Sequence, residues 1–134
     1  MSRIAPHINS EVRLVLGGLK PLATIEKVKD PYGFALAISL SYTGALNGYM
    51  ANSENGEPEV IVVRPSNKHL IMEYLLLLKY GVQEYGQIEY HRKMGRIFGY
   101  SEEDITAFIN SDIHCSCSKC NLSRDKMNAA ITKH

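Results

Sequence analysis

The sequence lacks tryptophan, has only three cysteines and contains no long hydrophobic run. The longest apolar run, residues 70–78, is interrupted by Glu73, and a membrane-spanning helix needs about 20 apolar residues. Residues 1–10 are mixed and polar, unlike the apolar core of a secretory signal. We therefore expect a cytoplasmic protein, in the host cytoplasm if the chain is viral, with no membrane partner.

A strong excess of charge of either sign is also missing. The 15 basic and 14 acidic residues give a formal net charge of +1, which is too small to favour non-specific DNA binding by the whole chain. Of the 134 residues, 45% are hydrophobic, as in an ordinary globular domain. We expect a single α+β domain over residues 1–110 and a cysteine-rich tail over residues 111–134, which is either metal-binding or flexible.

Sequence motifs of common enzymes are absent. The patterns GxSxG, HExxH, DxDxDG and GxGxxG do not occur, and neither does the phosphate-binding pattern GxxxxGK[ST]. No nucleophile can be paired with a base of its own. The sequence therefore favours a non-enzymatic binding protein over an enzyme.

Residues 11–64 have features typical of β-structure. The segment 34–41 alternates large and small side chains, as a half-buried strand does. It follows the sequence Asp-Pro-Tyr-Gly at residues 30–33, which is typical of a tight turn. Residues 22–29 and 34–41 are therefore predicted to pair as a hairpin. Further strands are predicted at residues 11–16, near 49–51 and at 59–63, the last of them central in the sheet.

Beyond residue 65 the hydrophobic pattern becomes that of helices. Ser66 or Asn67 is suited to begin a helix that Gly81 ends, and most sides of this helix are apolar. Further helices are predicted over residues 83–98, from the capping sequence at 101–104 to about 110, and over residues 124–132.

Together these patterns predict an α+β fold in which an N-terminal antiparallel sheet packs against two main C-terminal helices, followed by a short cysteine-containing tail. Because a helix that is apolar on most sides needs a covering surface, residues 70–78 also favour a homo-oligomer.

All three cysteines lie in one short segment near the C-terminus. Cys117 and Cys120 have the CxxC spacing that presents two sulfurs to one metal ion, and Cys115 is a candidate third ligand. The expected metal is zinc, while a reduced tail without metal and a redox-active CxxC stay open as alternatives. The candidate fourth ligand is His114, and because its neighbour Cys115 makes joint ligation awkward, His91, His134 or a second subunit are alternatives.

Cationic side chains suggest a second site, for an anion. Unpaired N–H groups at a helix start favour a negative charge, and arginine can bind phosphate through two parallel hydrogen bonds. An ordinary capped helix start and a solvated charged face are the alternatives. The candidate ligand-binding residues for a phosphate or carboxylate are Arg64, Ser66, Asn67, Lys68, Arg92 and Arg96.

The block HRKMGRIFGYSEEDITAFI, residues 91–109, resembles the helical part of small bacteriophage proteins. A β-rich front half followed by helices also resembles the small phage proteins that sequester cyclic ADP-ribose signals of the Thoeris defence system. The second resemblance implies a non-catalytic, oligomeric sponge with ligand pockets near subunit contacts. It is architectural and assigns no role to any residue of this chain.

Two functions are expected on these grounds. The first is a non-enzymatic protein that sequesters a phosphorylated, nucleotide-like small molecule, as a phage counter-defence sponge does. The alternative is a metal-stabilised interaction module that docks on a host protein or nucleic acid through the cysteine tail.

Overall fold

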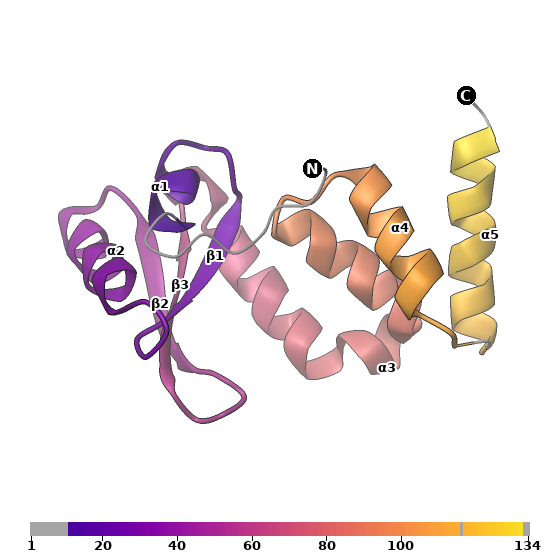
Figure 1. Cartoon of the computed structure of the whole chain (residues 1–134), viewed down its shortest axis with the longest axis horizontal. Coiled ribbons are helices and arrows are strands. Elements are labelled where there is room, and N and C mark those ends of the chain that lie inside the picture. The colour runs from indigo at the N-terminus through magenta and orange to yellow at the C-terminus, as the bar shows by residue number, and fades with distance from the viewer. Residues whose placement is uncertain (1–10, 116, 133–134) are drawn as a thin grey trace. The chain divides into compact units, whose positions relative to one another are not determined.

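The computed structural model describes residues 11–115 and 117–132, with side chains described up to residue 127. The described chain falls into two compact units, an N-terminal unit that ends at Glu73 and a C-terminal unit that begins at Tyr74. Figure 1 shows the elements in chain order: α1 (Glu11–Leu16), β1 (Leu22–Glu26), α2 (Pro31–Thr43), β2 (Asn47–Asn52), β3 (Pro58–Val63), the 3-10 turn η1 (Pro65–Asn67), α3 (His69–Ile97), α4 (Glu102–Asp112) and α5 (Ser118–Thr132).

The N-terminal unit is built on a three-stranded antiparallel sheet. The strand order is β1-β3-β2, so β3 is central, as its continuous apolar run predicts. Alternate residues of a strand point to opposite faces, and the face that carries Val60 and Val62 is covered by apolar side chains of both α1 and α2. The core on this face consists of Val12, Val15, Ala23, Ile25, Phe34, Ala37, Leu46, Val60 and Val62.

A buried ion pair ties α1 to the segment that leads into β1. Lys20 Nζ lies 2.5 Å from Glu11 Oε2, and the two side chains are only 8% and 13% exposed. A buried pair of this kind is costly to break, because removal of one partner leaves an uncompensated charge out of water. The pair therefore fixes where α1 sits on the sheet.

The predicted strand at 34–41, and with it the predicted hairpin, is wrong, because these residues form α2. Asp30 caps the helix: its Oδ1 accepts a hydrogen bond from the backbone N–H of Gly33 at 2.9 Å, and Pro31 occupies the first helical position. A Cβ on residue 33 would lie 2.2 Å from Asp30 Oδ2. The sequence at 30–33 is thus a helix start rather than a hairpin turn.

The predicted strand at 11–16 is also wrong. These residues form the short helix α1, which buries Val12 and Val15 at helical spacing. An apolar segment of this length fits both the strand and the helix period, so its pattern alone does not decide between them. The predicted strand near 49–51 is confirmed as β2.

The predicted helices at 66–80 and 83–98 correspond to two helical segments within α3, but the first continues past Gly81, so the predicted end of the first helix at Gly81 is wrong. The helical dihedral angles are instead interrupted at Gly86, with φ 80° and ψ 169°, a conformation that is essentially restricted to glycine. Gly81 lies against the ring of Tyr90, since a Cβ there would be 2.6 Å from Tyr90 Cδ1. The two glycines therefore allow the helix segments on either side of the break to approach each other.

The helices α4 and α5 complete the C-terminal unit. The predicted cap of α4 is confirmed, since Ser101 Oγ accepts the backbone N–H of Asp104 at 3.1 Å. The last helix begins at Ser118, six residues before the predicted start at 124. A second core cluster joins α3, α4 and α5, and its buried members are Ile88, Ile105, Ile109, Cys120 and Met127.

The coarse prediction of the fold is confirmed: an antiparallel sheet on the N-terminal side is followed by helices, with cysteines near the C-terminus, in a mixed α+β structure. No helix among residues 11–115 and 117–132 combines the length and the apolar character that crossing a membrane requires.

Candidate metal centre

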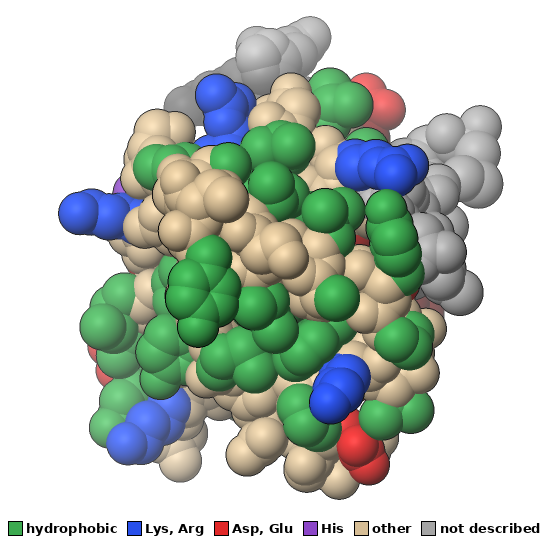
Figure 2. All heavy atoms as spheres, turned by 90° about the vertical axis from the view of Figure 1, so that its left-hand side faces the viewer, with side chains coloured by type: hydrophobic (Ala, Val, Ile, Leu, Met, Phe, Trp, Pro, Cys, Tyr) green, Lys and Arg blue, Asp and Glu red, His purple; other side chains and the backbone are tan. Residues whose placement is uncertain are grey.

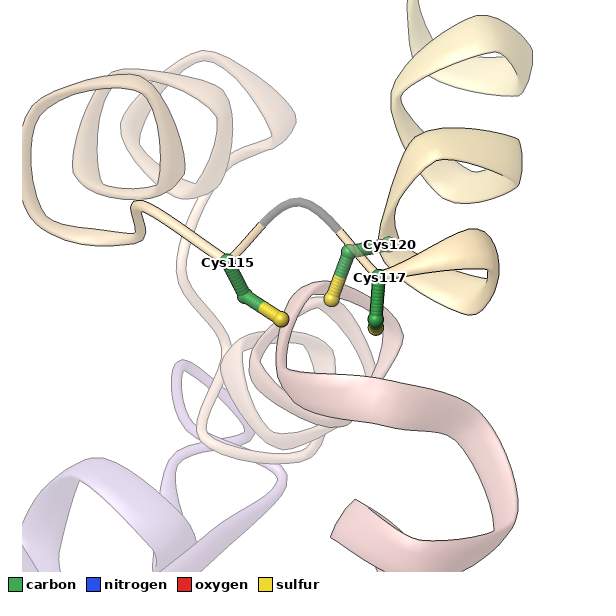
Figure 3. A group of neighbouring side chains, drawn as sticks. All are labelled: Cys115, Cys117 and Cys120. Atoms are coloured by element: carbon green, nitrogen blue, oxygen red, sulfur yellow. The ribbon is translucent and has the colours of Figure 1, made fainter.

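The three cysteines come together where the chain passes from α4 into α5. Cys115 lies in the connecting segment, Cys117 directly precedes α5, and Cys120 lies in its first turn. Their sulfur atoms all lie within 4.8 Å of one another, and Figure 3 shows the three side chains directed toward the same space. A tetrahedral zinc ion with bonds of about 2.3 Å places its sulfur ligands about 3.8 Å apart, so a closure of about 1 Å brings these thiols onto one metal ion.

Backbone N–H groups at the start of α5 stabilise the thiolate form of Cys117. The largest contribution is a hydrogen bond from the backbone N–H of Cys120, followed by hydrogen bonds from the thiols of Cys115 and Cys120 and from the backbone N–H of Lys119. Together they lower the pKa of Cys117 to about 7. The sulfur of Cys117 thus takes the place that a serine or aspartate oxygen takes at a capped helix start.

Cys115 has the opposite tendency. A hydrogen bond from the backbone N–H of Cys117 lowers the pKa of Cys115, but the thiols of Cys117 and Cys120, together with burial, raise it more, so the net pKa is raised. Three thiols that share protons in this way favour a cation in their midst, because a bound metal replaces the protons and keeps all three sulfurs ionised. The three cysteines lie close enough together to hold a metal ion.

The break in α3 makes room for this centre. A Cβ added at position 86 would lie 3.0 Å from the Cβ of Lys119 and 3.4 Å from the sulfur of Cys120. Lys119 Nζ donates a hydrogen bond to the carbonyl oxygen of Gln83, three residues before the break. Arg124 donates to the carbonyl oxygen of Ile113 at 3.2 Å, which ties α5 to the end of α4. The start of α5 therefore packs closely beside the break in α3, where the positive φ of residue 86 favours glycine and a Cβ would crowd Lys119.

The histidines considered as fourth ligands are not part of this group. His114 is exposed and does not belong to the set of ligand atoms that lie within 4.8 Å of one another. His91 packs against aromatic side chains, with its ring centroid 5.3 Å from that of Phe108, and burial lowers the pKa of His91. His91 is thus a half-buried histidine that packs on an aromatic ring. His134 lies outside the described residues.

Two of the predicted phosphate-binding arginines are engaged with carboxylates in the C-terminal unit. Arg92 lies 2.9 Å from Glu89, with both side chains largely buried, and Arg96 lies 2.8 Å from Glu102. Arg92 and Glu89 are three residues apart on α3, at the spacing that the sequence shows. A phosphate would have to compete with these carboxylates for the two guanidinium groups.

The other predicted ligand-binding residues lie in the N-terminal unit, between β3 and α3. Arg64, Ser66 and Lys68 are exposed and Asn67 is half-buried, around the single turn η1. The guanidinium of Arg64 lies over Gly18, where a Cβ would be 2.4 Å from its Nη1. Binding of a phosphorylated ligand by these residues stays a prediction.

One feature of the centre escaped the sequence analysis. Gly86 lies beside the cysteine site, because a Cβ there would be 3.4 Å from the sulfur of Cys120, although 34 positions separate the two residues in the sequence. A glycine inside a strongly helical pattern, where it costs about 1 kcal/mol relative to alanine, was the only available signal.

Comparisons with known proteins do not place the chain in a family. No family model matches it, and no curated protein or solved structure matches it either.

Proposed function

We propose that the C-terminal unit is a metal-stabilised interaction module in which Cys115, Cys117 and Cys120 hold a structural zinc ion. The observation that supports this proposal is the convergence of the three sulfurs within 4.8 Å. Thiolate is the ligand that zinc prefers in structural sites, and a short segment with CxxC spacing is its usual source. The role is structural and the module binds a partner rather than catalysing a reaction.

A structural ion at this position would compensate for a weak attachment of α5. Along the part of α5 whose side chains are described, the buried residues form one narrow stripe of Cys120, Ser123 and Met127. Such a stripe buries little apolar surface, and the hydrophobic contribution to the stability of the α5 packing is roughly proportional to that buried area. A metal ion that joins Cys115 to Cys120 adds a cross-link between the α4 end and the α5 start.

The surface that a fixed α5 presents supports the interaction role. Lys119, Leu122 and Lys126 are exposed and follow one another at helical spacing, and Leu122 is 57% exposed. Lys126 is the cation offered to a partner, since Lys119 Nζ already donates a hydrogen bond to the carbonyl oxygen of Gln83. An exposed leucine between lysines suits an acidic or mixed surface of a host protein, or the phosphates beside a nucleic-acid groove. The metal would hold this stripe in a fixed orientation.

Metal analysis of the purified chain tests the proposal. The protein is purified without chelator under reducing conditions, and metals are quantified by mass spectrometry. We expect one zinc ion per chain, and its loss in the Cys117→Ser and Cys120→Ser variants. Ser118→Ala, which changes an exposed residue between the two cysteines, is the matched control and should retain the metal. A wild-type chain with less than a few tenths of an equivalent of any metal rules the proposal out.

Cobalt substitution then identifies the fourth ligand. Co²⁺ bound by three thiolates gives sulfur-to-metal charge-transfer bands, and the intensity of its ligand-field bands reports tetrahedral coordination. If His114 completes the site, His114→Ala shifts these bands. If water or a residue of a second chain completes it, the bands in His114→Ala match those of the wild type.

A further inference from the structure

One long stretch of the N-terminal unit carries no charge at all. Residues 31–53 contain no aspartate, glutamate, lysine, arginine or histidine, although 22% of the chain is charged. The stretch begins after the capping residue Asp30 and ends before Glu54, and it contains all of α2 and all of β2. These two elements are neighbours in space as well, because Gly48 of β2 leaves room for Ser41 of α2, whose Oγ would be 2.3 Å from a Cβ at position 48.

The outer face of α2 is exposed but not polar enough for a solvated helix. A surface helix places charged side chains on the face opposite the core, whereas α2 exposes Tyr32, Ala35, Ser39 and Tyr42, the last of them 89% exposed. Figure 2 views the molecule from the side of α2 and shows apolar side chains gathered in the middle of this face, with lysine, arginine and acidic side chains toward its edges. This face has the chemistry of a contact surface.

The strand beside this helix has an exposed edge. Within the described sheet β2 pairs only with β3, so its outer edge has no strand partner there. Most of its residues are exposed, among them Tyr49 and Met50, the latter 54% exposed. Natural proteins protect such edges with lysine, proline or inward charges, and β2 has none of these. Alternate residues of β2 therefore offer unpaired N–H and C=O groups to another strand.

We propose that this uncharged face joins two copies of the chain, with β2 of one copy pairing antiparallel to β2 of the other and the two α2 helices approaching each other alongside. The edge groups of β2 call for an extended strand, and the β2 of a second copy is one. A two-fold contact places every residue near its own counterpart, so a charge close to the axis would meet a like charge. The 23 uncharged positions from 31 to 53 fit this requirement.

The dimensions of the face suit a dimer. The 13 residues of α2 and the six of β2 each span about 20 Å. A helix and a strand of this length side by side present several hundred Å² of surface, which approaches the roughly 800 Å² per partner of a stable interface. The dimer would contain one continuous sheet of six strands, three from each copy.

Sedimentation equilibrium of the full chain tests this proposal. We expect the wild-type protein to sediment as a dimer, and Met50→Lys to sediment as a monomer, because it brings two lysines together near the axis. Val28→Lys is the matched control: Val28 is 65% exposed but lies outside the uncharged stretch, so this variant should remain a dimer. A monomeric wild type, a dimeric Met50→Lys or a monomeric Val28→Lys overturns the proposal.

Charge pairing separates loss of the interface from loss of folding. Met50→Glu should also be monomeric by itself, and an equimolar mixture of Met50→Lys and Met50→Glu should form a heterodimer, because opposite charges then meet across the axis. Absence of the heterodimer from a mixture of two folded monomers contradicts the pairing of β2 with β2. The metal content of all these variants should equal that of the wild type, so the outcome is independent of the cysteine site.

Discussion

The two units of this chain are stabilised in different ways. The core of the N-terminal unit is continuous across α1, α2 and the sheet, and the buried pair of Glu11 and Lys20 is added to it. The C-terminal unit has a smaller cluster of buried residues, close contacts that depend on glycine at positions 81, 86 and 95, and three thiols at the start of its last helix.

This difference indicates where each unit is vulnerable. Branched side chains that alternate along β-strands form a core without help from a ligand. A helix attached by one stripe of side chains depends more on each individual tie. We therefore expect the N-terminal unit to tolerate metal removal and the C-terminal unit to respond to it.

If the three cysteines hold the proposed zinc ion, the largest effect should follow from its removal by a chelator. In a small thiolate site the binding free energy of the metal contributes directly to folding, so the metal-free chain should lose hydrogen-exchange protection throughout α5. The backbone amides of β1 and β3 should keep theirs. Exchange measured by mass spectrometry before and after chelation, with zinc restored as the reversal, checks this.

A matched pair of variants controls for unspecific effects of chelation. Cys120→Ser should reproduce the loss of protection in α5 without chelator, whereas Leu122→Ser, at an exposed position on the same helix, should not. Equal exchange of α5 with and without metal would contradict the proposed dependence.

The next largest effect should come from the buried ion pair in the N-terminal unit. Lys20→Met removes the ammonium group that lies 2.5 Å from the largely buried Glu11 carboxylate, and loss of one member of such a pair costs about 3–5 kcal/mol. Denaturant unfolding, followed by a spectroscopic signal of the β-sheet, measures this change in the free energy of unfolding. The metal content of the C-terminal unit should not change.

A double variant distinguishes the loss of the pair from a defect in packing. Glu11→Leu combined with Lys20→Met replaces both charges with apolar groups, a change that is often neutral or stabilising when a buried pair is exchanged for well-packed residues. The double variant should therefore recover most of the stability that Lys20→Met loses. If the double variant is as unstable as the single one, the ion pair does not explain the effect.

How far the sequence predicts this structure depends on how long and how unambiguous each pattern is. The run at 59–63 predicts β3 and its central place because a buried strand is apolar on both faces. The segment 34–41 fails as a predictor because its residues are apolar or small at every position, so the strand and helix periods fit it equally well. The helix forms because the Asp30 carboxylate accepts a hydrogen bond from the backbone N–H of Gly33. In the sequence alone, residues 30–33 match a tight turn equally well.

The candidate sites also differ in how well the sequence predicts them. The three cysteines are close in sequence, so their convergence is predictable from spacing alone, and it is observed. Arg92 and Arg96 share a helical face as predicted, but their carboxylate partners reduce their availability to a ligand. Gly86 and Cys120 are close in space but distant in sequence, and long-range proximity of this kind has no local signal.

The smallest effect, and the most specific one, should come from substitution of Gly86. Gly86→Ala forces a side chain into a conformation that costs about 1–3 kcal/mol, and the new Cβ would lie 3.4 Å from the sulfur of Cys120 and 3.0 Å from Lys119. We therefore expect weaker metal binding, measured by competition with a chromophoric chelator, together with the loss of stability.

Gly56→Ala is the matched control in the other unit: Gly56 has φ 79°, nearly the same as the 80° of Gly86, but a Cβ there meets nothing within 4 Å. It should lower stability through strain alone and leave the metal affinity unchanged. Equal metal affinity in Gly86→Ala and Gly56→Ala would mean that the break in α3 does not support the cysteine centre, and the C-terminal unit would then depend on the metal through the cysteine segment only.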